Sequence, residues 1–204
     1  MSPGELFDDE PEGTREAIMQ ATYRALRDHG YAGLTIQKIG DEFPKSKSLL
    51  YHHYDGKDEL LVDFLESMLD RLETDIPGEP SDDAYEQLTK ILDHVIAPTE
   101  DAERRSFTAA LIELRGQAAH NPAFRDHFTR SDRFFRDRLA DIIRRGVEDG
   151  TFRTVDAESV AALLLTVING AMLVASTTDS GGELQAVRRE LHQYLEQRLL
   201  AEVR

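Results

Sequence analysis

Apolar residues recur every three or four positions along most of this chain, and Pro or Gly residues interrupt the spacing at intervals. The first such stretch runs from Thr14, which we take as an N-cap, to His29, and Gly30 follows as its terminator. No stretch shows the sustained alternation with β-branched residues that is typical of strands. The pattern therefore predicts an all-α fold.

Two short helices are predicted after the first one. One lies between Thr35, a good N-cap, and Pro44, which cannot continue a helix. The next covers residues 46–53, and a long helix then runs over residues 57–74. Two short helices joined by a tight turn form a helix-turn-helix, so residues 14–61 are predicted to be a three-helix unit of that type.

Beyond residue 77 the same spacing predicts a bundle of longer helices. We expect them at residues 81–97, 101–119, 121–148, 156–177 and 183–203, with Ser81, Asn121 and Asp156 as caps and with a break near 129–132 left open. The first 13 residues are acidic and carry Pro and Gly, unlike a signal peptide, and we interpret them as a disordered tail. The chain thus divides into a tail (1–13), the helix-turn-helix unit (14–61) and a helical C-terminal domain (62–204).

The stretch from Val160 to Ala175 is nearly all apolar and resembles a membrane span at first sight. It is shorter than the roughly 20 residues that a bilayer requires, and acidic rather than basic residues precede it. We therefore expect a soluble protein with no membrane contact. A helix that is apolar all round needs cover on two sides, either from a partner subunit or from its own bundle in a monomer.

Charge is distributed unevenly along the chain. The formal net charge is −15, of which residues 1–13 contribute −5, residues 14–60 contribute 0 and residues 61–204 contribute −10. Four of the five lysines lie within residues 38–57, where random scatter would place about 0.5. Only this N-terminal unit is therefore expected to approach a polyanion such as nucleic acid.

Composition limits the remaining chemistry. Cysteine is absent, so disulfides and thiolate metal sites are excluded, which fits a cytoplasmic protein. We expect no metal and no cofactor. The abundance of Asp and Glu also suits concentrated salt, so a halophilic source is one hypothesis and an ordinary acidic protein is the other.

Residues 43–54 hold two lysines, two histidines, two tyrosines and no carboxylate. A solvated helix face is the plain interpretation of such a charge run, but the interleaved aromatic residues favour a surface that faces phosphate. Residues 43–54 are therefore expected to lie against nucleic acid.

The run Ser46-Lys47-Ser48-Leu49-Leu50-Tyr51-His52-His53-Tyr54, with Ile39 before it and Lys57 after it, resembles the N-terminal domain of TetR-family transcriptional regulators over residues 14–61. Gly40 stands where that family has Ala, the turn Phe43-Pro44-Lys45 replaces Ala-Gly-Val, and Tyr54 replaces Phe. Pro44 fixes φ near −65° at a position that is usually a flexible Gly, so the turn geometry is expected to differ.

Together with the charge pattern, the resemblance implies a set of residues that contact DNA, which we call the recognition surface. They are Thr35, Lys38, Lys45, Ser46, Lys47, Ser48, Leu49, Tyr51, His52, His53 and Lys57. Lys47, Ser48 and Leu49 are expected to contact bases, Lys47 through guanine O6/N7 and Leu49 through a thymine methyl. The positions matched by Thr35, Ser46, Tyr51, His52, His53 and Lys57 hold the DNA backbone in the family. For Tyr51 and His53 the alternative is ordinary packing at the domain junction.

The resemblance also implies a homodimer and an effector site in residues 62–204. The dimer would form through the last two helices, residues 156–177 and 183–203. An unknown small-molecule effector would bind between bundle helices, with plain core packing as the alternative. Its candidate ligands are Phe107, Leu111, Leu114, Arg115, Phe128, Asn169 and Met172.

The sequence therefore predicts a ligand-responsive dimeric transcriptional regulator, in the first place a repressor that binds a palindromic DNA operator in the major groove and leaves it when the effector binds. An enzyme is not expected, because the chain has neither paired Glu-x-x-His motifs nor a Gly-x-Ser-x-Gly elbow. The alternative is a helical protein–protein adaptor without sequence-specific DNA binding.

Overall fold

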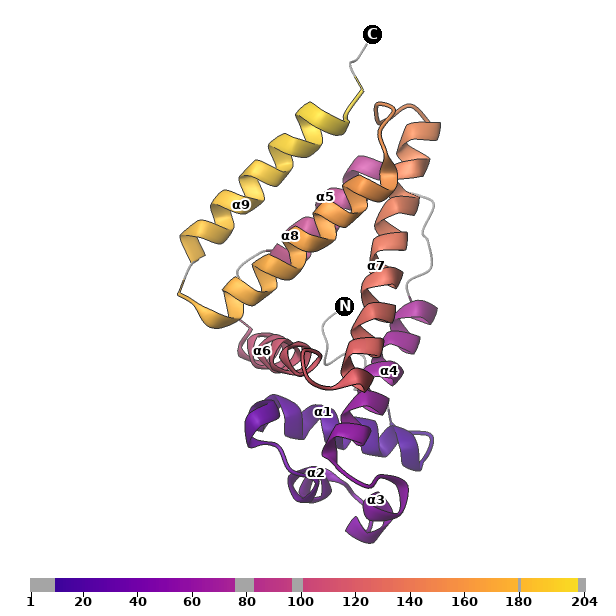
Figure 1. Cartoon of the computed structure of the whole chain (residues 1–204), viewed down its shortest axis with the longest axis vertical. Helices are drawn as coiled ribbons and strands as arrows, with labels where there is room; N and C mark the ends of the chain where they lie inside the picture. The colour runs from indigo at the N-terminus through magenta and orange to yellow at the C-terminus, as the bar shows by residue number, and fades with distance from the viewer. Residues whose placement is uncertain (1–9, 76–82, 97–100, 180, 202–204) are drawn as a thin grey trace. The chain divides into compact units, whose positions relative to one another are not determined.

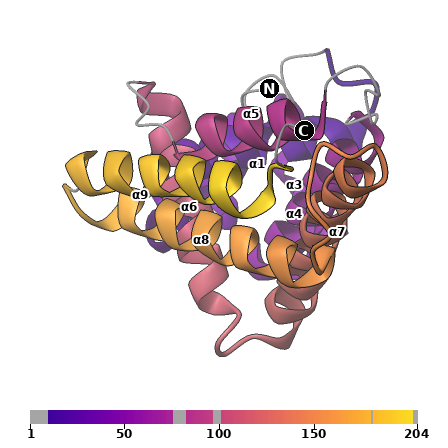
Figure 2. The same ribbon diagram turned by 90° about the horizontal axis from the view of Figure 1, so that it is seen from above.

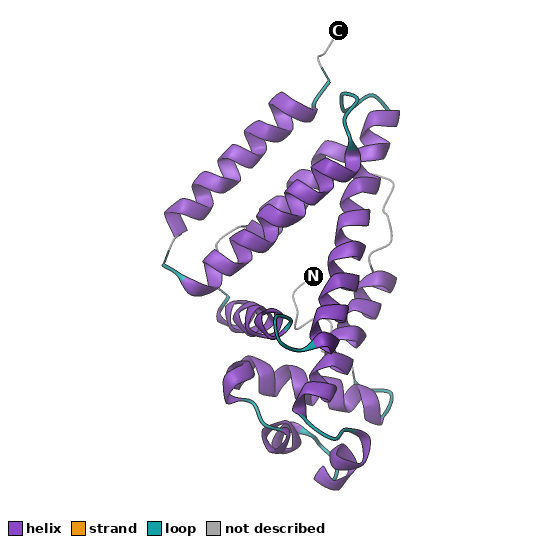
Figure 3. Cartoon of the chain, in the orientation of Figure 1, coloured by secondary structure: helices purple, strands orange, loops and turns teal. Residues whose placement is uncertain are grey.

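The computed structural model describes residues 10–75, 83–96, 101–179 and 181–201. Within these ranges the chain forms helices joined by short loops, and no strand occurs (Figure 3). The predicted all-α fold is confirmed. The predicted cap Ser81 and most of the predicted tail 1–13 lie outside the described residues.

The chain packs into two compact units, each described here by itself. One unit holds residues 1–77 and 99–129, and the other holds residues 78–98 and 130–204. The first contains α1 (Thr14–Gly33), α2 (Ile36–Glu42), α3 (Lys47–His53), α4 (Lys57–Asp75), α6 (Ala102–Gln117) and the start of α7 (Pro122–Glu148) (Figure 1). The second contains α5 (Ala84–Ile96), the rest of α7, α8 (Ala157–Thr177), α9 (Gly181–Tyr194) and the π-helical turn η2 (Leu195–Leu199).

The helix boundaries follow local capping in most places. Thr35, Asp101 and Asp156 are the N-caps of α2, α6 and α8, and each side chain accepts a hydrogen bond from the first turn. The caps Thr35 and Asp156 were predicted, and the cap Asp101 was not. α7 runs unbroken through residues 129–132. The functional division at residue 61 stays a prediction, since packing alone does not assign a role to either part.

The first helix differs from the prediction at both ends. Its N-cap is Gly13, which makes no side-chain cap bond, so the predicted cap Thr14 is wrong by one position. Gly30 does not end the helix but bends it, with φ 60° and ψ 173°, and a further turn continues to Gly33. Only glycine adopts that conformation readily, which explains the residue at the bend.

The first unit has a continuous core to which α1, α2, α3, α4, α6 and α7 all contribute. The ring of Phe107 lies 4.9 Å from that of Tyr23 on α1 and 6.3 Å from that of Phe64 on α4. Phe43, in the turn between α2 and α3, is buried, whereas Pro44 and Lys45 beside it are exposed. The altered turn therefore packs through Phe43 and leaves the charge of Lys45 in solvent.

In the second unit α5, α8 and α9 pack together, as the view from above shows (Figure 2). The last helix does not continue as an α-helix to residue 203 as predicted, because a π-helical turn follows Tyr194. The chain then joins the loop after α7 through an isolated antiparallel bridge between Phe152 and Leu200. The Arg153 amide donates to the Leu199 carbonyl oxygen at 2.7 Å.

Only one face of α8 is buried within its own chain. Ala161, Leu164 and Ile168 belong to the core, whereas Leu163 and Leu173 are 45% and 48% exposed. Among the described residues, this 21-residue helix is also the one long and apolar enough to cross a bilayer. The helix extends beyond the apolar stretch 160–175 at both ends, so the prediction that this segment is too short for a bilayer is wrong, although a core helix of a soluble protein has the same composition.

Candidate DNA-binding surface

The third helix presents a polar face and anchors itself with an apolar one. Leu50 is fully buried and Tyr54, one turn later, is half-buried, while Lys47, Ser48 and His52 are exposed. Tyr51 is 57% exposed, which is unusual for a tyrosine and means that it does not serve as core packing. The predicted orientation of this helix is confirmed.

Hydroxyl groups surround the beginnings of α2 and α3. The Thr35 hydroxyl accepts from the Lys38 amide at 3.2 Å. Ser46 is the N-cap of α3 by position, but its hydroxyl makes no cap bond and instead lies 2.7 Å from the Ser48 hydroxyl. Both serines are exposed, and their contacts with DNA stay a prediction.

Each lysine of the recognition surface has a partner within the protein. Lys45 donates to the Thr14 hydroxyl at 3.1 Å, and Lys38 donates to the Gly33 carbonyl oxygen at 2.7 Å. Lys47 forms an ion pair with Asp41 of α2. Lys45 and Lys47 are exposed and can exchange these partners for DNA, whereas Lys38 is only half-exposed.

Lys57 holds the end of the first helix. Its ammonium donates to the carbonyl oxygens of Tyr31 and Leu34 at 3.2 and 3.4 Å and lies 4.1 Å from the centre of the Tyr31 ring. A cation at the carbonyl end of a helix is stabilising, so this geometry gives Lys57 a structural role. Its contact with a phosphate stays a prediction. Leu49 is half-buried against the core, and its contact with a base also stays a prediction.

A carboxylate that sequence reasoning missed fixes the end of α3. Asp63 of α4 accepts from the Tyr54 hydroxyl at 2.5 Å and from two nitrogens of Arg15 at 2.5 and 3.2 Å. Burial alone would raise the pKa of Asp63, but the hydrogen bonds from Arg15 and Tyr54 outweigh it and hold that pKa below its usual value. Burial and the same carboxylate raise the pKa of Tyr54. The Asp63 carboxylate of α4 thus links α4 to Arg15 of α1 and to Tyr54, the C-cap of α3.

We expect Asp63→Asn to lower the free energy of unfolding by about 1–2 kcal/mol at pH 7, because a charged acceptor is lost at a partly exposed site. A carboxyl group with a lowered pKa stabilises the fold above its unfolded value of about 3.9, and that contribution disappears as the pH falls through the folded value. Urea unfolding should therefore show a difference at pH 7 that shrinks towards pH 3. Glu66→Gln on the same helix is the control. If it lowers the free energy of unfolding as much as Asp63→Asn does, the bonds from Arg15 and Tyr54 to Asp63 contribute no stability of their own.

A second missed carboxylate joins α6 to the bend of α1. Glu113 accepts from the amides of Tyr31 and Ala32 at 2.7 and 3.2 Å. A Cβ on Gly30 would lie 3.3 Å from the same carboxylate oxygen, tighter than ordinary contacts. At the other end of α6, Glu103 accepts from the Tyr23 hydroxyl at 2.7 Å. The second half of α1 is therefore tied to both ends of α6.

The expected effector residues fall into two separate groups. Phe107, Leu111, Leu114 and Phe128 pack into or against the core of the first unit, and Arg115 lies over the Phe128 ring at 5.0 Å. Asn169 and Met172 lie on α8 in the second unit and are half-buried. Phe107 and Leu114 are fully buried, so plain core packing accounts for them. The assignment of an effector to these residues stays a prediction.

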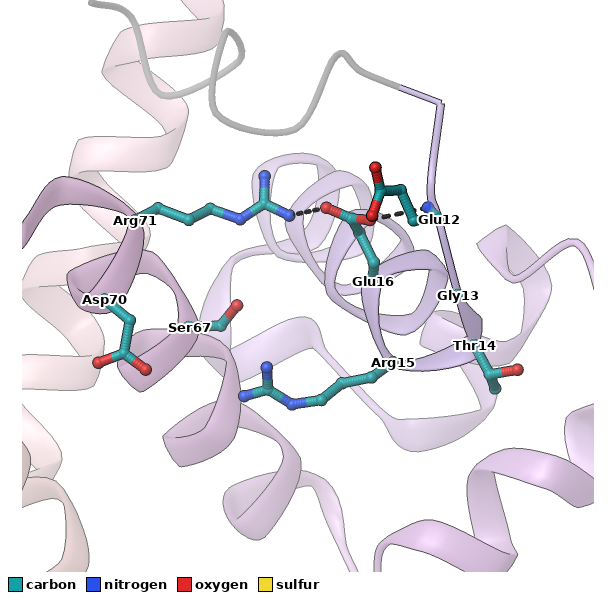
Figure 4. Close-up of a pocket in the computed structure, with 8 residues that line it drawn as sticks. All are labelled: Glu12, Gly13, Thr14, Arg15, Glu16, Ser67, Asp70 and Arg71. Atoms are coloured by element: carbon teal, nitrogen blue, oxygen red, sulfur yellow. Dashed lines mark hydrogen bonds and ion pairs between the residues drawn. The ribbon is translucent and has the colours of Figure 1, made fainter. Parts of the chain in front are cut away.

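A cavity of about 630 Å³ lies elsewhere, between the start of α1 and the second half of α4 (Figure 4). None of the effector candidates lines it; its walls are Glu12, Gly13, Thr14, Arg15, Glu16, Ser67, Asp70 and Arg71. Arg71 pairs with Glu16, and Arg15 pairs with Asp63. Both guanidinium groups that line the cavity are therefore already paired with carboxylates.

Comparison with known proteins accounts for both parts of the chain. Residues 18–64 match the model of bacterial regulatory proteins of the tetR family, and residues 84–200 match the model of the C-terminal domain of BetI-type transcriptional repressors. The second match alone covers more than half of the chain. The chain belongs to the TetR family.

Solved and curated relatives agree with this TetR-family assignment. The crystal structure of a TetR transcription regulator from Haloarcula marismortui is 40% identical, covers 91% of this chain and 98% of its own, and superposes with a TM-score of 0.79. A transcriptional regulator from Saccharomonospora viridis, in complex with choline, is 22% identical with a TM-score of 0.74 and covers 92% of this chain and 98% of its own. The transcriptional repressor AcnR of Corynebacterium glutamicum is 27% identical over 79% of this chain and 81% of its own.

Membership of the TetR family makes this protein a ligand-responsive transcriptional repressor. Members bind DNA operators and act as dimers, so DNA and a second copy of the chain are its partners. Nothing favours the alternative of a protein–protein adaptor. The relatives are regulators rather than enzymes.

Proposed function

We propose that this TetR-family protein acts as a cytoplasmic homodimer that represses transcription by placing α3 in the major groove of a palindromic operator. The exposed face of α3 is the observation that carries this proposal, because Lys47, Ser48 and Tyr51 project from a helix that Leu50 and Tyr54 fix in place. Lys47 and Ser48 at its start are suited to base edges. Tyr51, His52 and the hydroxyls of Thr35 and Ser46 are suited to phosphates.

The dimer is proposed to form through α8 and α9. The exposed positions Leu163, Thr166, Gly170 and Leu173 of α8 follow a three-and-four spacing and so share one face. A Cβ on Gly170 would meet nothing within 4 Å, so this face leaves room for the close approach of a partner helix. A twofold pairing through this face would present two copies of α3 to successive turns of DNA.

Release of the operator is proposed to run through α6. An effector that shifts α6 would move Glu103 and Glu113, and with them the middle and the C-terminal end of α1 that these carboxylates hold. Leu111, Arg115 and Phe128 are the candidate effector ligands that remain partly exposed on α6 and the start of α7. The effector can change operator affinity only by binding the two arrangements unequally.

The acidic surface is proposed to suit concentrated salt. Few cations are available for DNA, so the affinity should fall only shallowly with salt, since each neutralised phosphate contributes about 0.9 to the logarithmic slope. The solved relative from Haloarcula marismortui fits the same hypothesis about the source. A steep loss of DNA affinity between low and high salt would contradict the predicted shallow salt dependence.

The test is binding to the intergenic DNA upstream of the protein's own gene, with bulk DNA as competitor. Lys47→Ala and Tyr51→Ala should each weaken selective binding about 10- to 100-fold, the value of one good base or backbone contact. Arg133→Ala on α7 removes an exposed cation outside the recognition surface and should change the affinity less than about twofold. Absence of selective binding by a folded wild-type protein would overturn the proposed function.

A further inference from the structure

The first residue of the third helix is restrained by the second helix. The Lys47 ammonium, at the start of α3, forms an ion pair with the Asp41 carboxylate of α2. Helices α2 and α3 are the two short helices of the helix-turn-helix (Figure 1). The side chains are 45% and 58% exposed, respectively, so both remain open to solvent and to DNA. Residues 43–54 contain no Asp or Glu. The carboxylate that pairs with Lys47 therefore comes from outside this run, from Asp41.

The path of the Lys47 side chain depends on Gly40. A Cβ built on Gly40 would lie 3.0 Å from Cγ and 3.2 Å from Cδ of Lys47, closer than almost all such contacts. The stem of Lys47 therefore rests on the bare backbone of α2, where the family pattern that this chain resembles has Ala. This course leads the ammonium to the next residue of α2, which is Asp41.

An ammonium group has three donors, and the carboxylate of Asp41 occupies one of them. The other two can reach the O6 and N7 acceptors of a guanine while the ion pair is kept. A lysine held in this way loses less side-chain entropy when it meets a matched base, and it is less free to turn to the phosphates that all DNA offers. The nearby carboxylate also repels those phosphates.

We propose that Asp41 is a specificity-determining residue that positions Lys47 for a base and keeps it from phosphates. The inference rests on the proposed function, since it concerns how the operator is told apart from other DNA. Asp41 acts through Lys47 and belongs to the positioning residues. Its effect should therefore appear as a change in the ratio of operator affinity to bulk-DNA affinity.

The experiment compares Asp41→Asn with Glu42→Gln for binding to operator and to bulk DNA at fixed salt. Glu42 is exposed on the same helix, so both variants remove one negative charge near the DNA. In Asp41→Asn we expect bulk-DNA affinity to rise about three- to tenfold and operator affinity to change less than about twofold, so the ratio falls. In Glu42→Gln both affinities should change by the same factor. The loss of discrimination should be concentrated at one guanine of each half-site.

A double variant separates the effect of Asp41 on the position of Lys47 from the effect of its negative charge alone. In a Lys47→Met background, Asp41→Asn should raise both affinities equally, because there is no ammonium left to position. The inference is overturned if Asp41→Asn behaves like Glu42→Gln, or if its effect on the ratio persists without Lys47. If the wild type itself shows no preference for operator over bulk DNA, the proposed function fails instead, and this outcome is distinct from the other two.

Discussion

Replacing Leu163 and Leu173 together by Glu is expected to convert the dimer into monomers and to weaken operator binding by about 100-fold or more. Each leucine is about half-exposed in the single chain and would be covered by the partner helix. A fully buried leucine contributes about 1.5–3 kcal/mol, and twofold symmetry doubles the number of sites. The variant would bury four carboxylates without partners, and a monomer loses the gain from binding two half-sites at once.

Sedimentation and filter binding measure the two effects on the same samples. Ala119→Glu with Ala123→Glu adds the same charge at exposed positions at the junction of α6 and α7 and should leave a dimer that binds the operator. A double-leucine variant that stays dimeric would place the interface on another surface. A monomer with full operator affinity would show that dimerisation is not needed for binding.

Gly146→Ala is expected to lower the free energy of unfolding by about 2–4 kcal/mol, although Ala is the better helix former. A Cβ at Gly146 of α7 would lie 2.3 Å from Cδ2 of Phe152 and 2.7 Å from Cβ of Ala84. Both neighbours are buried, so neither can move aside without disturbing the core of the second unit. For a protein of this size the melting temperature should fall by about 2–4 °C per kcal/mol.

Gly116→Ala provides the matched control. Gly116 lies in α6, and a Cβ there would meet nothing within 4 Å. The same substitution should therefore stabilise the protein by up to about 1 kcal/mol through helix propensity alone. The difference in free energy of unfolding between the two variants, measured by heat or urea, gives the cost of the clash at Gly146. Equal stabilities would mean that Phe152 and Ala84 move aside at little cost.

Features set by neighbouring residues could be predicted from the sequence. The N-caps Thr35 and Asp156 lie where expected, because a cap bond joins residues about three positions apart. The orientation of α3 followed from the four-residue spacing of Leu50 and Tyr54. The π-helical turn after Tyr194 was missed, since it accompanies a long-range bridge to the loop at Phe152.

The groups that hold the DNA-binding surface in place could not be predicted. Asp63 and Glu113 were two among the chain's 39 carboxylates, and only the folded chain brings them to Tyr54 and to the bend at Gly30. Gly146 and Gly116 are likewise indistinguishable as helix glycines until the neighbours of each are known. Patterns along the sequence give faces of helices, whereas these contacts depend on how two helices meet.

The most direct test of operator binding by a dimer is a hydroxyl-radical footprint of the wild-type protein on its own upstream DNA. We predict two protected patches of equal strength, about 10 base pairs apart from centre to centre, with one dimer bound per operator. Asp41→Asn should protect the same patches with a weaker preference over flanking DNA. A single patch of half-site length, or uniform protection along the fragment, would contradict a dimer that reads a palindrome through α3.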